Sequence, residues 1–154
     1  MSGDRLASYH VLVDKRKACG VCNGLTNPSA CANGSYDSDH IGPWTLWQGK
    51  LDAELMIVVQ DWGDRDYFVK NRGRDLADNP TNNTLHGLLA SIGIDIEKPT
   101  LLDSGGGAIF LTNAVLCLKN GGMQGPTDST WFANCGSRFL RPTIEISARK
   151  LLLR

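Results

Sequence analysis

Four of the five cysteines are spaced as ligands for one metal site. Cys19 and Cys22 form a Cys-x-x-Cys pair, in which a tight turn brings both sulfurs to the same metal or cluster. Cys117 and Cys135 have 17 residues between them, which suits one thiolate on the loop after a strand and one on the next helix. Zinc and a 4Fe-4S cluster both accept four thiolates, so both remain open. Cys31 has no partner at ligand spacing and is expected to be a small buried hydrophobe.

Polar residues follow the two most apolar segments of the chain. Gln60 and Asp61 end the run "ELMIVVQD", and Asn113 ends "AIFLTN". A carboxylate at the end of a strand can hold a water molecule or stabilise a cation, and a carboxamide offers a donor and an acceptor together. The structural alternatives are a turn for "DWGD" and a strand cap for Asn113.

These side chains need a parallel sheet to bring them together. Residues 54–60 and 105–113 contain near-continuous apolar runs, which are typical of buried parallel strands. Residues 4–18, 81–94 and 126–146 have apolar residues at helical spacing. This order predicts a three-layer α/β/α fold with a short, mainly parallel sheet, and places function at the carboxyl ends of the strands. The chain stops soon after the third helix, so the sheet is expected to be incomplete at the C-terminus.

Composition favours one soluble domain. The chain has 154 residues with 42% hydrophobic content, enough for one core, so residues 1–154 are expected to form a single domain. Sixteen basic residues balance 16 acidic ones, which leaves no global field to attract nucleic acid. Since the sequence contains neither a signal peptide nor a membrane span, we expect a cytoplasmic monomer with free thiols.

The segment "FLTNAVLCLKNGGMQGPTDSTWFANC" resembles the uracil-DNA glycosylase superfamily and, within it, the iron–sulfur-containing bacterial and archaeal enzymes (the family 4/5 type). In those proteins a strand ending in Thr-Asn leads to a cysteine, a Gly/Pro-rich loop and a helix that carries the last cluster ligand. "RKACGVC" resembles their N-terminal helix, which supplies the other two ligands, and "ELMIVVQDWGD" resembles the first motif of the superfamily. The resemblance covers roughly residues 8–146.

The resemblance implies a DNA repair enzyme that hydrolyses the N-glycosidic bond of uracil, or of another deaminated base, in DNA. Asp61 would hold or activate the water, and Gln60 would position the uracil carbonyl. Asn113 would pair with the O4 and N3–H edge of the base. The resemblance also implies a 4Fe-4S cluster, rather than zinc, on Cys19, Cys22, Cys117 and Cys135.

A base in such a pocket also needs an aromatic stacking partner and phosphate contacts. Trp62, Tyr67 and Phe68 lie just beyond the first motif, and Tyr67 and Phe68 are the preferred candidates for stacking. A local basic rim is expected to contact phosphate through Lys15, Arg16, Lys17, Lys119 and Arg138.

Two departures from the family pattern leave the activity open. Val59 stands where the family has a glycine before the polar pair, and the histidine loop of the second motif has no counterpart. The resemblance therefore implies a glycosylase truncated at its C-terminus. The alternatives are an inactive truncated glycosylase, or a non-catalytic four-cysteine zinc or iron–sulfur module that binds nucleic acid.

Overall fold

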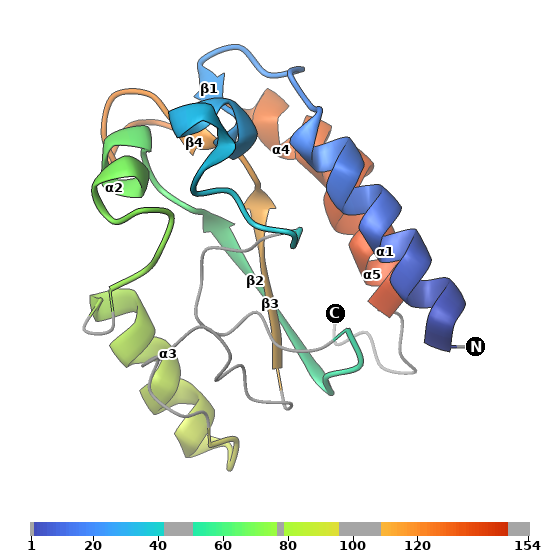
Figure 1. Cartoon of the computed structure of the whole chain (residues 1–154). Helices are drawn as coiled ribbons and strands as arrows, with labels where there is room; N and C mark the ends of the chain where they lie inside the picture. Colours follow the sequence, from blue (N-terminus) through green and yellow to red (C-terminus); the bar gives the residue numbers. More distant parts are fainter. Residues whose placement is uncertain (1, 42–50, 77–78, 96–108, 148–154) are drawn as a thin grey trace.

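The computed structural model describes residues 2–41, 51–76, 79–95 and 109–147 (Figure 1). Within these ranges the chain has a mixed α/β fold, in which strands β2 (Leu55–Asp61) and β3 (Ile109–Val115) pair in parallel. Leu55 lies opposite Ile109, and Asp61 lies opposite Val115. Both strands therefore end at the same edge of the sheet, where the sequence predicts the functional residues.

Helices pack against both faces of this strand pair (Figure 1). On one face, Ile109 packs with Leu89 of α3 (Pro80–Ser91). On the other face, Phe110 meets Tyr9 of α1 (Ser2–Lys17) edge to face, with ring centroids 6.5 Å apart. Successive side chains of a strand point to opposite faces, so each of the two neighbours Ile109 and Phe110 reaches a different hydrophobic cluster.

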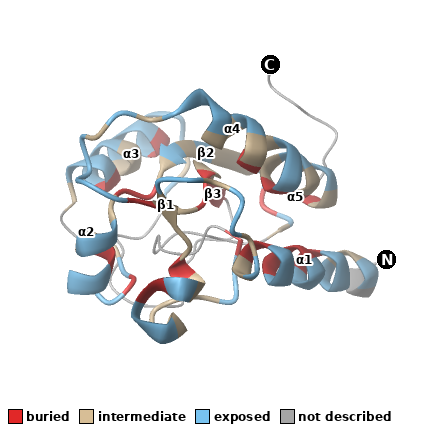
Figure 2. Cartoon of the chain, turned by 90° about the horizontal axis from the view of Figure 1, so that it is seen from above, coloured by how far each residue is buried: buried red, intermediate tan, exposed pale blue. Residues whose placement is uncertain are grey.

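Helix α1 buries one stripe of side chains (Figure 2). Tyr9, Leu12, Val13 and Arg16 are buried and recur at the three- and four-residue spacing of one helical face. This face lies along the C-terminal helices, where Arg5 Nε donates to the carbonyl of Ile146 at 3.0 Å.

The C-terminal helices follow one another without a break in the chain. They are α4 (Ser129–Cys135), the π-helix η2 (Gly136–Leu140) and α5 (Arg141–Ser147). Asp128 caps α4, because its Oδ1 accepts from the backbone N–H of Thr130 at 2.8 Å. An aspartate at this position is a common helix N-cap.

A second, small sheet joins the cysteine loops. Strand β1 (Leu25–Thr26), just after Cys22, pairs antiparallel with β4 (Leu118–Lys119), just after Cys117. The 3-10 segment η1 (Pro28–Gly34) follows β1, and helix α2 (Arg65–Lys70) packs beside β4 and η1. This pairing brings together two parts of the chain that are far apart in sequence.

The predicted strands and helices are confirmed within the described residues, with shifts of a few residues at their ends, whereas residues 105–108 of the second predicted strand lie outside them. Strand β3 is almost fully buried, whereas β2 is half-buried and its Val58 is 41% exposed. The sheet is predicted to be incomplete at the C-terminus, but residues 148–154 lie outside the described residues. No helix of the described chain is long and apolar enough to cross a membrane.

Candidate functional site

Asp61 and Asn113 line one pocket of about 170 Å³ at the carboxyl edge of the β2–β3 pair. The register places Val59 opposite Asn113, so Asp61 stands two residues farther along the neighbouring strand. Val59 also lines this pocket and lies within regular strand β2, so its β-branched side chain is accommodated there. The predicted grouping of a carboxylate and a carboxamide is therefore present.

Asn113 is buried without a hydrogen-bond partner for its side chain. Its relative exposure is 1%, and neither Nδ2 nor Oδ1 has a partner among the described residues. A buried polar group without a partner costs roughly 1–3 kcal/mol, so proteins seldom keep one where it has no role. A side chain that caps a strand would form hydrogen bonds with backbone groups, and the Asn113 side chain forms none with the described residues.

Asp61 is held at the pocket by an ion pair. Lys119 Nζ lies 3.4 Å from Asp61 Oδ2, and Gln60 Nε2 donates to the same oxygen at 3.2 Å. Lys119 Nζ also donates to the carbonyl of Met123 at 2.8 Å. This bond attaches the glycine-rich loop at residues 121–125 to the pocket. Two residues after Asp61, Gly63 has a backbone φ of +124°. Residues with a side chain rarely adopt this conformation.

Asp75 is a second carboxyl group in this pocket, and the sequence analysis did not identify it. Asn79 Nδ2 donates to its Oδ1 at 3.3 Å, and Asn82 Nδ2 donates to its Oδ2 at 3.2 Å. Burial raises the pKa of Asp75 to about 6, although these two hydrogen bonds act in the opposite direction. Asn79 also caps α3 by accepting from the N–H of Thr81, and that capping pattern is the only local signal nearby.

The predicted aromatic residues are placed differently from the expectation. Trp62 lines the pocket, whereas Tyr67 and Phe68 do not. Phe68 is fully buried with Cys31 and Leu118, and Tyr67 packs against that cluster edge to face with Trp62 at 6.3 Å. Gln60 is also outside the pocket lining and contacts Asp61 from the exposed side of β2. Among the described residues, Trp62 is therefore the aromatic residue that lines this pocket.

The four predicted cysteine ligands line a second cavity, of about 300 Å³. Cys19 and Cys22 come from the loop after α1, Cys117 from the turn between β3 and β4, and Cys135 from the end of α4. Asn134 Nδ2 donates to Cys22 Sγ at 3.4 Å. Cys31 lies elsewhere, buried against Trp62 and Phe68, as expected.

The thiols are close enough to influence one another's ionisation. Burial raises the pKa of Cys117 to about 12, and the other three thiols add to the rise. Burial also raises the pKa of Cys135, with further contributions from Cys22 and Cys19. The four thiols share the lining of one cavity with other side chains, and no group of three or more His, Cys, Asp or Glu side chains in the described ranges is arranged to hold a metal ion.

The pocket and the thiol cavity have a common support in the turn after β3. Cys117 lines the cavity and Lys119, two residues later, pairs with Asp61 at the pocket.

Comparison with known protein families and with curated proteins finds no match. The chemistry of these two sites is therefore the basis for inferring a function.

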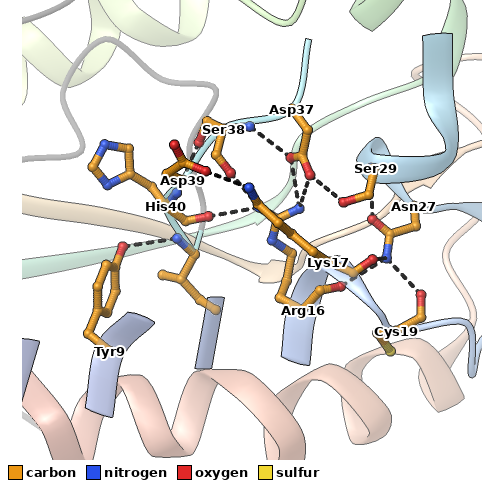
Figure 3. Close-up of polar contacts among 11 residues, drawn as sticks. Tyr9, Arg16, Lys17, Cys19, Asn27, Ser29, Asp37, Ser38, Asp39 and His40 are labelled. Carbon is orange, nitrogen blue, oxygen red and sulfur yellow. Dashed lines mark hydrogen bonds and ion pairs between the residues drawn. The ribbon is translucent and has the colours of Figure 1, made fainter. Parts of the chain in front are cut away.

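Three contacts hold the Cys19–Cys22 loop in place. Asn27 Nδ2 donates to the carbonyls of Arg16, Lys17 and Cys19 at 2.9, 3.2 and 2.7 Å, which satisfies the C-terminal end of α1 (Figure 3). Trp131 Nε1 donates to the carbonyl of Asn23 at 3.0 Å. The β1–β4 pairing completes the attachment. The loop is thus fixed to both α1 and the turn that carries Cys117.

The prediction of a phosphate contact is wrong for two of the five basic residues, Arg16 and Lys119. Arg16 is 1% exposed and binds Asp37, and Lys119 is buried beside Asp61 (Figure 3 for Arg16). Both cations are used inside the fold because a buried carboxylate requires a partner. Lys15 and Arg138 are exposed, and Lys17 is half-buried in an ion pair with Asp39.

Proposed function

We propose that this protein is a DNA glycosylase that hydrolyses the N-glycosidic bond of uracil, or of another deaminated base, in DNA. The observation that carries this proposal is the side chain of Asn113, which is buried in a pocket with neither polar atom partnered among the described residues. Both atoms can pair with the O4 and N3–H edge of a uracil flipped into the pocket. Base binding would then supply the hydrogen bonds that the protein leaves unmade.

The size and lining of the pocket support a single flipped base. Its volume of about 170 Å³ lies below the roughly 300–1,000 Å³ of pockets for drug-sized ligands. Trp62 offers an aromatic face, and Leu85 and Leu111 add apolar lining. A ring-sized, half-apolar pocket with one carboxamide suits a pyrimidine.

Asp61 has the position required for the second half of the reaction. Cleavage leaves positive charge on the sugar, and water must then add at the anomeric carbon. A carboxylate beside the base pocket can stabilise that charge and accept the proton of the water. Lys119 orients Asp61 through the ion pair, and Gln60 donates to the same carboxylate.

We further propose that the four cysteines hold a 4Fe-4S cluster. A zinc ion binds thiolates at about 2.3 Å and would draw four sulfurs to one point, whereas these four line a cavity of about 300 Å³. The donor set and the space both suit a cluster with one thiolate at each iron. When bound, the cluster supplies cross-links between the loop after α1, the turn after β3 and α4.

The finer description of the fold belongs to the same proposal. With α3 on one face of β2–β3 and α1 with the C-terminal helices on the other, the arrangement agrees with a three-layer α/β/α glycosylase domain (Figure 1). Arg138 lines the thiol cavity, and Lys15 and Lys17 lie in the last turn of α1; these three are the basic residues proposed to contact DNA phosphates.

The test is excision from a single-stranded oligonucleotide that contains one uracil, which avoids the cost of opening a base pair. The protein is purified without oxygen, and the abasic product is cleaved with alkali. We expect strand cleavage at uracil, none at thymine, and a loss of about a hundredfold or more in Asp61→Asn. Absence of cleavage at uracil would contradict the proposal.

A second candidate function is supported by the thiol cavity alone. The cavity, its loop and the exposed basic residues would be present in a non-catalytic iron–sulfur module that binds nucleic acid. That function predicts binding of the same oligonucleotide without any abasic product, and equal binding by Asn113→Leu and the unmodified protein.

A further inference from the structure

The pocket contains two carboxyl groups whose surroundings differ. Asp61 lies against the ammonium group of Lys119 and the amide of Gln60. Asp75 receives hydrogen bonds only from the amides of Asn79 and Asn82 among the contacts of the described residues. Two carboxyl groups in unlike environments are the usual basis for dividing the roles of acid and base between them.

The charged groups around Asp75 are few. Asp61, from β2, is the other titratable side chain among the described residues that line the pocket, and its charge is matched by Lys119 from β4. Helix α3 contributes neutral amides at its first turns, and Trp62 and Met123 complete this side of the pocket. Arg74 precedes Asp75 in the chain but does not line the pocket, and the pKa of Asp75 is set by burial and by the amides of Asn82 and Asn79.

Departure of the base is the step that needs an acid. When the bond between the anomeric carbon and N1 breaks, its electron pair goes to the base, which becomes an anion. Among the described residues, no cation lines the pocket to balance this negative charge. The nearby Lys119 is already paired with Asp61. A neutral carboxyl group can donate its proton instead.

We infer that Asp75 is the acid of the proposed glycosylase, donating its proton to the departing base while Asp61 accepts a proton from the attacking water. The inference rests on the proposed function. The C1′–N1 bond breaks, the proton of Asp75 moves to the base, and the water oxygen bonds to C1′. Asp75 is left as a carboxylate and Asp61 protonated, and exchange with solvent restores both.

The ionisation of Asp75 supports this role independently. Its pKa of about 6, raised by burial, keeps about half of it protonated at pH 6 and about a tenth at pH 7, whereas an ordinary aspartate is almost fully ionised at both. Each oxygen of Asp75 accepts one hydrogen bond, from Asn79 or Asn82, and the residue lines the pocket.

Leaving-group dependence separates an acid from a structural residue. The fluorine of 5-fluorouracil stabilises the departing anion, so this base needs less protonation than uracil. Excision of both bases from matched single-stranded oligonucleotides is measured in single-turnover experiments between pH 5 and 9. The proteins are the cluster-containing wild type, Asp75→Asn and Asp75→Glu, with Asp66→Asn on the exposed side of α2 as the matched control.

For the wild type we expect uracil excision to fall as pH rises above about 6. Asp75→Asn should lose about a hundredfold on uracil and clearly less on 5-fluorouracil, with no such fall in rate. Asp75→Glu should keep a pH-dependent rate, and Asp66→Asn should match the wild type.

Equal losses on the two bases, or an unchanged pH profile in Asp75→Asn, would overturn the inference and leave the glycosylase proposal standing. A wild type that excises neither base would overturn both. Circular dichroism of each variant checks folding, and if Asp75→Asn does not fold, a uracil rate in Asp75→Glu that does not depend on pH would equally overturn the role of Asp75.

Discussion

The guanidinium group of Arg16 and the carboxylate of Asp37 form a buried ion pair behind the cysteine loop (Figure 3). Arg16 Nη1 donates to the two carboxylate oxygens at 2.8 and 2.9 Å, and Nη2 donates to the carbonyls of Ser38 and His40 at 2.8 and 3.0 Å. The side chains are 1% and 5% exposed. One arginine thus attaches the end of α1 to residues 37–40, three positions before Cys19.

Asp37→Ala is expected to destabilise the protein strongly. Removing one partner of a buried pair leaves the other charge uncompensated, at a cost of about 3–5 kcal/mol. The matched control is Asp39→Ala, because Asp39 pairs with Lys17 from an exposed position. Urea unfolding at pH 7 measures both, and a similar small loss in the two variants would show that the Arg16 pair does not support the fold.

Replacing any one of the four cavity cysteines by serine is expected to remove iron from the protein. The cavity needs all four thiolates to bind a cluster of four irons, whereas Cys31 lies in a separate hydrophobic cluster. Cys31→Ser should therefore keep full iron content. Iron and zinc analysis with visible absorption spectroscopy of anaerobic protein gives the answer, and stoichiometric zinc without iron would reject the cluster.

Asn113→Leu is expected to stabilise the protein while abolishing excision. The substitution removes two buried, unpartnered polar atoms and keeps a similar volume, so unfolding should cost about 1–3 kcal/mol more than in the wild type. Thermal and urea unfolding are compared with uracil excision. A loss of both stability and activity would indicate that Asn113 supports the strand end instead of binding a base.

Asn113→Asp is expected to change base preference. A carboxylate offers only acceptors, which suit the amino group of cytosine better than the O4 of uracil. Excision from oligonucleotides with a single uracil or a single cytosine measures the ratio of the two rates. An unchanged ratio in Asn113→Asp, with activity retained, would exclude Asn113 from reading the base.

Stability should fall with rising pH because of Asp75. Its pKa is about 6 in the folded protein and near 3.8 when unfolded, so the folded state binds the proton more tightly between these values. This contribution is fully present below about pH 4 and is lost as pH rises through 6, by on the order of 1–2 kcal/mol between pH 4.5 and 7.5. Urea unfolding at both pH values should show this change in wild type and not in Asp75→Asn. Asp66→Asn should keep it.

The elements and the grouping of four cysteines around one cavity could be predicted from the sequence because their signals are local. Apolar runs at 54–60 and 105–113 mark strands, and the spacing of Cys19, Cys22, Cys117 and Cys135 follows from the turn and the helix that carry them. Asp128 caps α4 for an equally local reason. Parallel pairing then brings Asp61 and Asn113 to one edge, as the chain order of strands and helices predicts.

The tertiary structure alone decided which polar residues are buried and what each one faces. The sequence predicts that Lys119 and Arg16 are surface cations. In the structure each is buried and pairs with a carboxylate from another part of the chain. Asp75 has no local signal, because its raised pKa depends on burial beneath α3 rather than on its neighbours in sequence. Likewise, the choice of Trp62 over Phe68 depends on packing around Cys31 and Leu118. Burial is a property of the whole fold, whereas spacing and caps are properties of a few residues.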